Sequence, residues 1–410
     1  MVRPLKGATA ADTHSAILDL IRSSGVVSRI ELADRSGLTE ASISRIIKQL
    51  LADGVIAETG FGDRTGGRRR ILLQLNPGSR HAVGVSLDVA KITYLLTDLS
   101  GAVVGRLDSA GIGHQEPTEV TGRIAAELEQ MITSTDIDRG TLMGMGMAVP
   151  GRKDSAHQVV RSNPEATDWD LSDIEETLST TTNLPVMVEN DSTCAAMGEY
   201  WVGRIPASED FATVYLASGF GLGFVTKGDV YRGSSSNAGE IGHMILDVNG
   251  PLCWCGSHGC LEALAAPKRI VERALERRGL AAELGLLGKS TSVRQDAAVI
   301  AAAAAAGQEQ SLPLIEESAS YVAKALVSMT NLLDLDQIIL AGPGFGPAGE
   351  IYVRWARQEL QRLSFVRAVH ATRVGLSASG ELSAALGAAA LVLHSRLTPH
   401  QRSARLAVAV

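Results

Sequence analysis

A short run of cysteines is the feature that most restricts the fold of this 410-residue chain. Cys253, Cys255 and Cys260 are three of its four cysteines, and His243 lies shortly before them. Thiolates this close together on a glycine-bearing loop can bind one metal ion in tetrahedral geometry, with a nearby histidine as the fourth ligand. The spacing C-x-C-x4-C differs from the usual C-x2-C of zinc sites, and buried free thiols are the alternative. We expect a metal site that fixes this loop.

The length and composition indicate a protein of several domains that stays in solution. A chain of 410 residues is too long for one compact core, so two or three domains are expected. A hydrophobic content of 45% and a charged content of 20% are ordinary for such a protein. No apolar run approaches the roughly 20 residues that span a bilayer, and the N-terminus lacks the apolar core of a signal peptide. Scarce, clustered cysteines favour a reducing compartment, and we therefore expect a cytoplasmic protein without membrane association.

Charge is distributed unevenly along the chain. The first 80 residues hold 12 basic and 8 acidic residues, a net charge of +4, whereas the whole chain carries −7. The remaining residues are therefore strongly acidic. A basic head on an acidic body suggests that the head binds something anionic.

The head has the pattern of a helix-turn-helix. Apolar residues recur at helical spacing from His14 to Ile21. Ser28-Arg-Ile-Glu31 is a capping box that opens a second, short helix, and Ser36-Gly37 makes a tight turn. Thr39 is expected to cap a third helix that runs to about Ala52.

The third helix has one apolar and one polar face. Ile43, Ile46, Ile47 and Leu50 are expected to face inward. Short hydroxyls together with basic side chains suit contact with base edges and phosphates in a major groove. The candidate DNA-binding residues on this helix are Thr39, Glu40, Ser42, Ser44, Arg45 and Lys48.

A basic hairpin follows the third helix. Val55-Ile56 begins one strand, Ile71 to Leu75 forms the other, and the tip holds Arg68, Arg69 and Arg70. Such a tip fits a wing that reaches the DNA backbone or minor groove, so these arginines join the candidate DNA-binding residues. The alternative is a solvated basic loop on a helical module that binds protein.

Beyond Pro77 the pattern changes to alternating strands and helices. Strands are expected at 82–87, 91–97, 143–149 and 186–189, with a helix over 116–133. Two α/β halves with ligand loops at the strand ends suggest a cleft between domains.

These motifs resemble the ROK family (repressors, open reading frames, kinases) over nearly the whole chain. The supporting segments are Gly144-Met-Gly-Met-Ala-Val-Pro-Gly151, Glu189-Asn-Asp191, Ala238-Gly-Glu240-Ile-Gly-His243, the cysteine run through Glu262, and Ile338-Ile-Leu-Ala-Gly342. The resemblance implies an α/β fold in which a winged helix-turn-helix precedes an actin-like, sugar-kinase-like body of two lobes.

The resemblance also implies a sugar pocket and a structural zinc ion. The zinc ligands would be His243, Cys253, Cys255 and Cys260, with His258 as a competing fourth ligand. The sugar ligands would be Asn163, Asn190, Asp191, Glu240, His243 and Glu262. Carboxylates and an amide suit a ring of hydroxyls, and His243 can bind zinc through one ring nitrogen and the sugar through the other. The alternative for Glu240 and Glu262 is a pair of solvated acids.

The segment that would hold phosphate departs from the family pattern. Kinases of the family begin their body with Asp-x-Gly-Gly-Thr, and this chain has Ser86-Leu-Asp88-Val89-Ala90-Lys91 in that place. A carboxylate and side chains where glycines let backbone N–H groups approach phosphate bring repulsion and crowding. Asp191, which would act as the base toward a sugar hydroxyl, is retained as a vestigial group. We therefore expect no catalytic residue and no ATP-dependent activity.

The expected domains are a DNA-binding head at 1–80, a small lobe at 81–191 and a large lobe at 192–383 with the zinc site and the oligomer interface. A C-terminal helix at about 384–396 is expected to pack back on the small lobe. The leading interpretation is a transcription regulator, a repressor, that binds a double-stranded operator as a homodimer or homotetramer and senses a sugar or sugar phosphate. The alternatives are an active hexose kinase with a DNA-binding head, and a metal- or redox-sensing regulator with a vestigial pocket.

Overall fold

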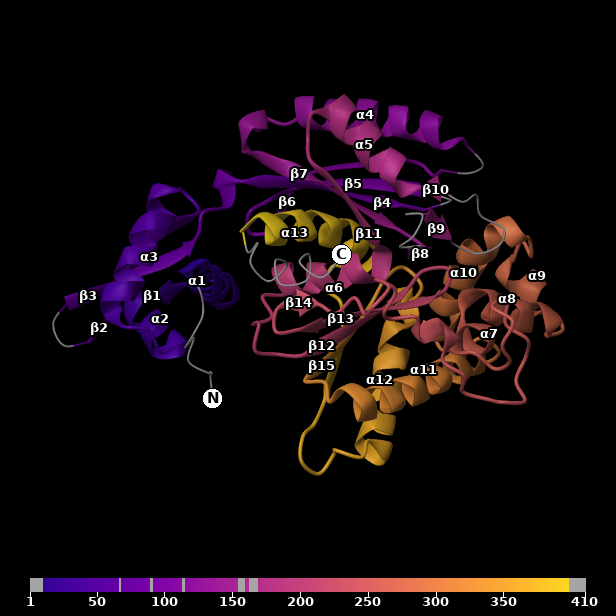
Figure 1. Cartoon of the computed structure of the whole chain (residues 1–410). Helices are drawn as coiled ribbons and strands as arrows, with labels where there is room; N and C mark the ends of the chain where they lie inside the picture. Colours follow the sequence, from indigo (N-terminus) through magenta and orange to yellow (C-terminus); the bar gives the residue numbers. More distant parts are fainter. Residues whose placement is uncertain are drawn as a thin grey trace.

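The computed structural model describes residues 10–65, 68–88, 91–112, 115–153, 159–161 and 169–397. Its elements form a small N-terminal head beside a body built on two five-stranded sheets (Figure 1). Among these described residues, no helix is both long enough and apolar enough to cross a membrane.

The head is a winged helix-turn-helix, as the sequence predicts. Its helices are α1 (Ala10–Ser24), α2 (Arg29–Ser36) and α3 (Glu40–Ala52), and its sheet has the order β1-β3-β2, with β1 at Val27–Ser28, β2 at Ile56–Thr65 and β3 at Arg68–Leu75. Both sides of the predicted capping box at Ser28 and Glu31 are formed. Gly37 ends α2 in the left-handed conformation (φ 70°), which allows the tight turn into α3.

The first sheet of the body is mixed and has the order β11-β7-β4-β5-β6. Its strands are β4 (His81–Leu87), β5 (Lys91–Asp98), β6 (Val103–Ala110), β7 (Leu142–Val149) and β11 (Val186–Asn190). Helices α4 (Pro117–Thr133) and α5 (Leu171–Thr182) pack on its outer face through a cluster of buried apolar side chains (Figure 1). A short sheet of β8 (Arg152–Lys153), β9 (Val159–Arg161) and β10 (Trp169–Asp170) lies beside it.

The second sheet of the body has the order β14-β13-β12-β15-β16. Its strands are β12 (Phe211–Leu216), β13 (Phe220–Thr226), β14 (Asp229–Val230), β15 (Gln337–Ala341) and β16 (Arg373–Leu376). The largest apolar cluster joins this sheet to the helices that follow it. These are α7 (Leu261–Ala265), α8 (Pro267–Glu276), α9 (Leu280–Leu284), α10 (Val293–Ala305), α11 (Leu312–Leu333) and α12 (Gly349–Leu363).

Two helices, α6 (Asp191–Val202) and α13 (Ser383–Leu397), lie side by side between the two sheets (Figure 1). They approach the strands and each other closely because glycine stands at the contacts. A Cβ atom on Gly84 or Gly146 would overlap the backbone of α13, and one on Gly387 would overlap the carbonyl of Cys194 in α6. The predicted C-terminal helix therefore contacts β4 and β7, and it also contacts α6 along its length. The domain boundaries at 80 and 191 stay a prediction.

Candidate functional site

Helix α3 presents the polar face that the sequence predicts. Thr39 caps the helix by accepting a hydrogen bond from the Ser42 N–H at 3.3 Å. Ile43, Ile46, Ile47 and Leu50 are buried in the core of the head. The exposed candidate DNA-binding residues are Thr39, Glu40, Ser44, Arg45 and Lys48, whereas Ser42 is half-buried.

Sequence reasoning missed Gln49 on the same helix. Gln49 is exposed and follows Arg45 by four positions, so it extends the polar face by one turn. The helical period could have identified Gln49 as an exposed residue, because Gln49 falls outside the buried stripe of the helix. An amide at this position can pair with adenine in the major groove.

The basic hairpin is formed by β2 and β3, which are antiparallel, with Arg64 opposite Arg69 and Thr65 opposite Arg68. The tip at residues 66–67 and the side chains of Arg68 and Arg69 lie outside the described part of the chain. Arg70 is half-buried in β3. Contact of these three arginines with DNA stays a prediction.

The structure brings the four predicted metal ligands together. One ligand atom from each of His243, Cys253, Cys255 and Cys260 lies within 4.8 Å of the others. The Cys253 Sγ is 3.6 Å from Nδ1 of His243, and the Cys255 and Cys260 sulfurs are 3.7 Å apart. Three sulfurs and one imidazole nitrogen match the tetrahedral donor set of structural zinc.

His258, the competing ligand, is turned away from this cluster. Its Nδ1 lies 3.1 Å from the carbonyl oxygen of Gly250. The loop closes through isolated bridges that pair Leu252 with His258 and Ile245 with Cys260. Gly259 (φ 66°) is required at this point, since a Cβ there would overlap the carbonyl of Asp247.

Trp254 joins the metal cluster to a predicted sugar ligand. Its indole Nε1 donates to Glu262 Oε1 at 2.6 Å, and its ring packs edge-on against the His243 imidazole with centroids 4.8 Å apart. The Glu262 carboxylate also packs against Gly219 and Gly242, where any Cβ would crowd it. The sequence did not indicate a role for Trp254, because the spacing motif of the cysteines does not specify the residue between two ligands.

Replacing Trp254 with phenylalanine is expected to weaken sugar binding about five-fold. The ring is kept, but the N–H that orients the Glu262 carboxylate is lost, and such a hydrogen bond contributes about 1 kcal/mol. Isothermal titration of wild type and variant measures the difference. Unchanged sugar affinity would show that Trp254 does not position Glu262.

Asn190 and Asp191 lie where β11 runs into α6. Asn190 is the N-cap of α6, accepting from the N–H groups of Ser192 at 2.9 Å and Thr193 at 3.3 Å. Its Nδ2 donates to the Gly151 carbonyl at 3.0 Å. Both ends of the amide are therefore engaged within the protein, which favours a role in placing Asp191 at the first position of the helix.

The carboxyl group of Asp191 is in an unusual environment. Burial raises the pKa of Asp191 to about 7, and the negative charges of Asp88 and Glu240 add to the effect. Glu240 is exposed and opens the short helix that ends at His243, whose N–H donates to the Glu240 carbonyl at 3.0 Å. The charge of Glu240 acts on Asp191, and Trp254 contacts both His243 and Glu262. That these four residues form one sugar site stays a prediction, and Asn163 lies outside the described residues.

Replacing Asp191 with asparagine is expected to flatten the pH dependence of stability. Because the pKa of Asp191 is raised to about 7 in the folded protein, its carboxyl group keeps its proton between about pH 4 and 7. In the unfolded chain the same group has already lost that proton over this range. The free energy of unfolding of the wild type therefore falls as the pH rises over this range, by about 4 kcal/mol from this group. Asp88, Glu240 and Tyr215 face Asp191 and remain in the variant.

Urea unfolding at pH 5 and pH 8 measures this difference. The exposed Asp136, replaced by asparagine, is the matched control and is expected to leave the wild-type pH dependence unchanged. An Asp191 variant with the full wild-type pH dependence would contradict the assignment.

An ion pair crosses from one lobe to the other at the predicted phosphate segment. Asp88, which follows β4, is 2.9 Å from Arg294 of α10, and both side chains are partly exposed. Sequence reasoning singled out Asp88 but missed Arg294, which lies 206 positions away and has no pattern linking it to Asp88. Val89 and Ala90 lie outside the described residues.

A cavity of about 180 Å³ adjoins this ion pair. It is lined by Arg294, by the turn at Pro343 and Gly344, and by Glu381. The structure thus places the turn that follows β15 beside Arg294.

Comparison with protein families gives two matches. The model of the ROK family matches residues 82–395, and a model of winged helix-turn-helix DNA-binding domains matches residues 11–57. Among curated proteins, the xylose repressor of Caldicellulosiruptor bescii is 25% identical over 392 residues, covering 93% of this chain and 95% of that protein. The xylose repressor of Bacillus subtilis is 31% identical over 257 residues, 62% of this chain and 66% of that protein.

A further curated protein is named for a different sugar. The N-acetylglucosamine repressor of Escherichia coli O157:H7 is 28% identical over 333 residues, 80% of this chain and 79% of that protein.

Solved structures share the fold. A ROK family transcriptional regulator described as a homologue of the E. coli MLC protein superposes with a TM-score of 0.71 at 23% identity, covering 95% of this chain and 98% of that one. A ROK family glucokinase from Streptomyces griseus, in complex with glucose and AMPPNP, gives a TM-score of 0.63 at 25% identity, covering 76% and 98%. The glucokinase match covers less of this chain than the regulator match does.

Proposed function

This chain belongs to the ROK family, and from that premise we propose that it is a DNA-binding transcriptional repressor whose body senses a sugar and does not phosphorylate it. The observation that carries the proposal is the winged helix-turn-helix, with the exposed polar face of α3, joined to a ROK body. The regulators with similar sequences support it, since they are named as repressors over most of this chain's length.

The effector we propose is a monosaccharide or its phosphate. Asp191, Glu240, His243 and Glu262 offer acceptors at several neighbouring points, as a ring of hydroxyls requires. The names of the similar repressors refer to two different sugars, xylose and N-acetylglucosamine. We therefore propose only the class of effector, a monosaccharide or its phosphate, and identify the individual sugar by screening. We use d-xylose, N-acetylglucosamine and glucose, each with its phosphate, as probes in a melting-temperature screen.

The metal we propose is one structural zinc ion held by His243, Cys253, Cys255 and Cys260. Nδ1 of His243 approaches the Cys253 sulfur at 3.6 Å, which would leave Nε2 available to a sugar hydroxyl. Zinc would fix the loop that carries Trp254, and through Trp254 it would fix the Glu262 carboxylate. Its role would be to shape one wall of the pocket.

Loss of kinase activity is proposed from the phosphate segment. By the resemblance to the family, Asp88 would stand where its kinases have glycine, and Asp88 pairs with Arg294 of α10. A triphosphate approaching this point would meet like charge and would have to break the ion pair. Asp191 would then serve as a hydrogen-bond acceptor for the sugar.

A coupled assay for ADP release with ATP, Mg²⁺ and the sugar probes tests this part of the proposal. We expect no sugar-dependent turnover. Turnover that disappears in Asp191→Asn would establish the alternative, an active hexose kinase with a DNA-binding head.

The assembly we propose is a homodimer or homotetramer on a two-fold operator, with the domain boundaries given above. Two heads related by a two-fold axis would read half-sites about one helical turn apart. Selection of duplexes from a random pool by the full-length protein tests both specificity and symmetry. We expect an enriched palindromic sequence; failure to enrich any sequence at low salt would contradict the DNA-binding function.

A further inference from the structure

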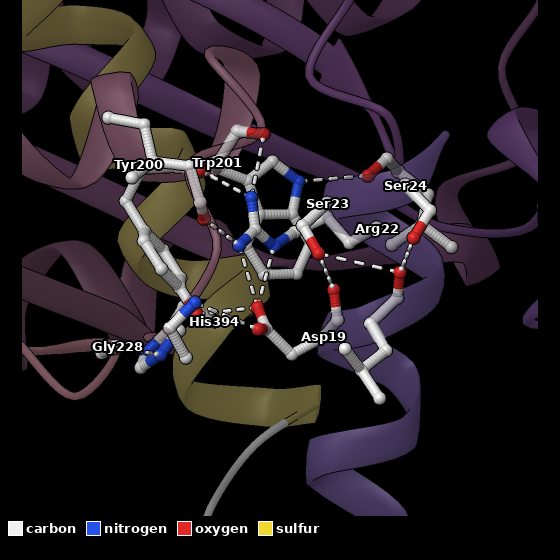
Figure 2. Close-up of polar contacts among 12 residues, drawn as sticks. Asp19, Arg22, Ser23, Ser24, Tyr200, Trp201, Gly228 and His394 are labelled. Atoms are coloured by element: carbon white, nitrogen blue, oxygen red, sulfur yellow. Dashed lines mark hydrogen bonds and ion pairs between the residues drawn. The ribbon is translucent and has the colours of Figure 1, made fainter. Parts of the chain in front are cut away.

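Two charged residues of the first helix are buried where the head meets the body. Asp19 and Arg22 of α1 form an ion pair with an Nη2–Oδ1 distance of 2.6 Å, and their side chains are 12% and 2% exposed. Buried charges of this kind are rare unless they are paired and fully hydrogen-bonded. Figure 2 shows that both side chains point away from the head, toward residues of α6 and α13.

Arg22 binds the last turn of α6. Its Nη1 donates to the carbonyls of Tyr200 and Trp201, the latter at 3.3 Å, and its Nη2 donates to the carbonyl of Ile205 at 2.6 Å (Figure 2). The last carbonyls of a helix lack partners within the helix and carry partial negative charge. A guanidinium group supplied by the head therefore caps a helix of the body.

Asp19 completes the connection. Its carboxylate accepts from the Tyr200 hydroxyl and from the Ala207 N–H, the latter at 3.3 Å. The Arg22 guanidinium also stacks on the Tyr200 ring, 4.0 Å from its centroid. Apart from the ion pair between Asp19 and Arg22 themselves, these polar contacts join α1 to the segment that ends α6 or follows it.

His394 of α13 closes the group from the other side. Its ring packs edge-on against Tyr200 and Trp201, and its Nε2 lies 3.1 Å from the Gly228 carbonyl oxygen. Burial lowers the pKa of His394 to about 4, so the ring is neutral near pH 7 and adds no positive charge beside Arg22.

The opposite end of α6 belongs to the candidate sugar pocket. The helix begins at Asp191 and ends at Val202, a length of about 18 Å. All ten residues from Ser192 to Trp201 are buried, and Gly198 and Gly387 hold the helix against α13. A helix packed in this way moves as a rigid unit, so a displacement at Asp191 reaches Tyr200.

We propose that Asp19 and Arg22 are positioning residues that transmit sugar binding through α6 to the DNA-binding head. The inference rests on the proposed function, because it assigns the route by which the sugar pocket acts on DNA. When the lobes rearrange around a sugar at Asp191, the end of α6 moves and α1 follows it through these contacts. The recognition face of α3 then changes its orientation, because α1 and α3 share one core.

The test compares the effect of sugar on DNA affinity in matched variants. The test variant Asp19→Asn with Arg22→Met removes both charges together, which avoids leaving one buried charge without its partner. The control, Asp34→Asn with Arg35→Met, makes the same changes on exposed residues of α2. The probe is whichever of d-xylose, N-acetylglucosamine and glucose most raises the wild-type melting temperature, with the duplex enriched by the wild type.

In the wild type and control, saturating sugar is expected to change the duplex dissociation constant about ten-fold or more. In the test variant this factor is expected to fall below about two-fold, while sugar affinity without DNA stays within three-fold of wild type. A purely structural role would lower both affinities and leave the factor intact. A folded test variant that keeps the wild-type factor overturns the inference.

Two further outcomes are distinguishable. If the wild type itself shows no effect of sugar on duplex binding, the proposed function fails and the inference fails with it. If the test variant does not fold, Arg22→Lys is measured in its place. Its single ammonium group keeps the positive charge but cannot reach all three carbonyls, so the effect of sugar on duplex affinity is again expected to fall. A wild-type factor in Arg22→Lys then overturns the inference.

Discussion

Replacing Cys260 with serine is expected to abolish stoichiometric zinc binding and to lower sugar affinity about 100-fold or more. Cys260 is fully buried and its sulfur lies 3.7 Å from that of Cys255, so no water can take its place without disrupting the loop. Structural zinc sites contribute on the order of 10 kcal/mol to local folding, and removal of one thiolate forfeits much of it. The loop then no longer holds Trp254 and Glu262 against the pocket. Metal analysis and isothermal titration with the sugar probe measure the two effects.

Two controls separate the metal from general damage. His258→Ala alters a histidine within the same loop that points to the Gly250 carbonyl, and Cys194→Ala removes the cysteine that lies in α6 outside the cluster. Both are expected to retain one zinc ion per chain and wild-type sugar affinity. A zinc-free Cys260 variant with unchanged sugar binding would show that metal and pocket are independent. Release of DNA on oxidation of the thiols, with no response to any sugar, would instead support a redox-sensing regulator.

Replacing Arg45 and Lys48 together with alanine is expected to weaken duplex binding about 100-fold at moderate salt. Both side chains are exposed on the polar face of α3. An arginine that pairs with guanine contributes about 1–3 kcal/mol, and each phosphate contact adds about one unit to the salt dependence. Fluorescence anisotropy at several salt concentrations measures affinity and slope.

The matched control removes the same charge from the body. Arg354 and Arg362 lie on α12 and form ion pairs with Glu316 and Glu359, so their replacement by alanine changes net charge equally. This control is expected to bind the duplex as the wild type does. Wild-type affinity in the Arg45 and Lys48 variant would place the DNA contacts on another element of the head.

Local signals predicted the head well. The capping box at Ser28 and the N-cap at Thr39 act within one helical turn, so their residues are neighbours in the sequence. The buried stripe from Ile43 to Leu50 follows the helical period directly. Such short-range contacts set where α2 and α3 begin and which face of α3 is buried, so the sequence indicates them directly.

The sequence pattern could not predict contacts between segments that lie far apart in the chain. The partners of Arg22 lie about 180 positions away, and nothing in the composition of α1 indicates a burial site for a guanidinium. Asp88 and Arg294 belong to different lobes, and their pairing depends on how the sheets are placed around α6 and α13. The carboxylates of the candidate pocket could be predicted because they fall in family motifs, and their role stays a prediction. Trp254 could not, because its contact with Glu262 forms only once the cysteine loop is folded.

The proposed function and the further inference together connect the cysteine cluster, the candidate pocket, α6 and the head. In that proposal a zinc ion on the cysteine cluster would fix the loop that contacts Glu262, and Glu240 and Asp191 would extend the pocket to the start of α6. The end of α6 is bound by Arg22 of the head. Sugar binding in the pocket would therefore alter DNA binding by the head, provided that the two conformations differ in affinity for both ligands.

Titration of the sugar probe into the free protein and into its complex with the enriched duplex measures the coupling between sugar binding and DNA binding. Linkage requires that a sugar which weakens DNA binding by a given factor binds the DNA complex more weakly by the same factor. We predict a sugar dissociation constant about ten-fold or more higher in the complex than in the free protein. Equal sugar affinity in the two states would contradict the claim that this ROK body regulates its DNA-binding head.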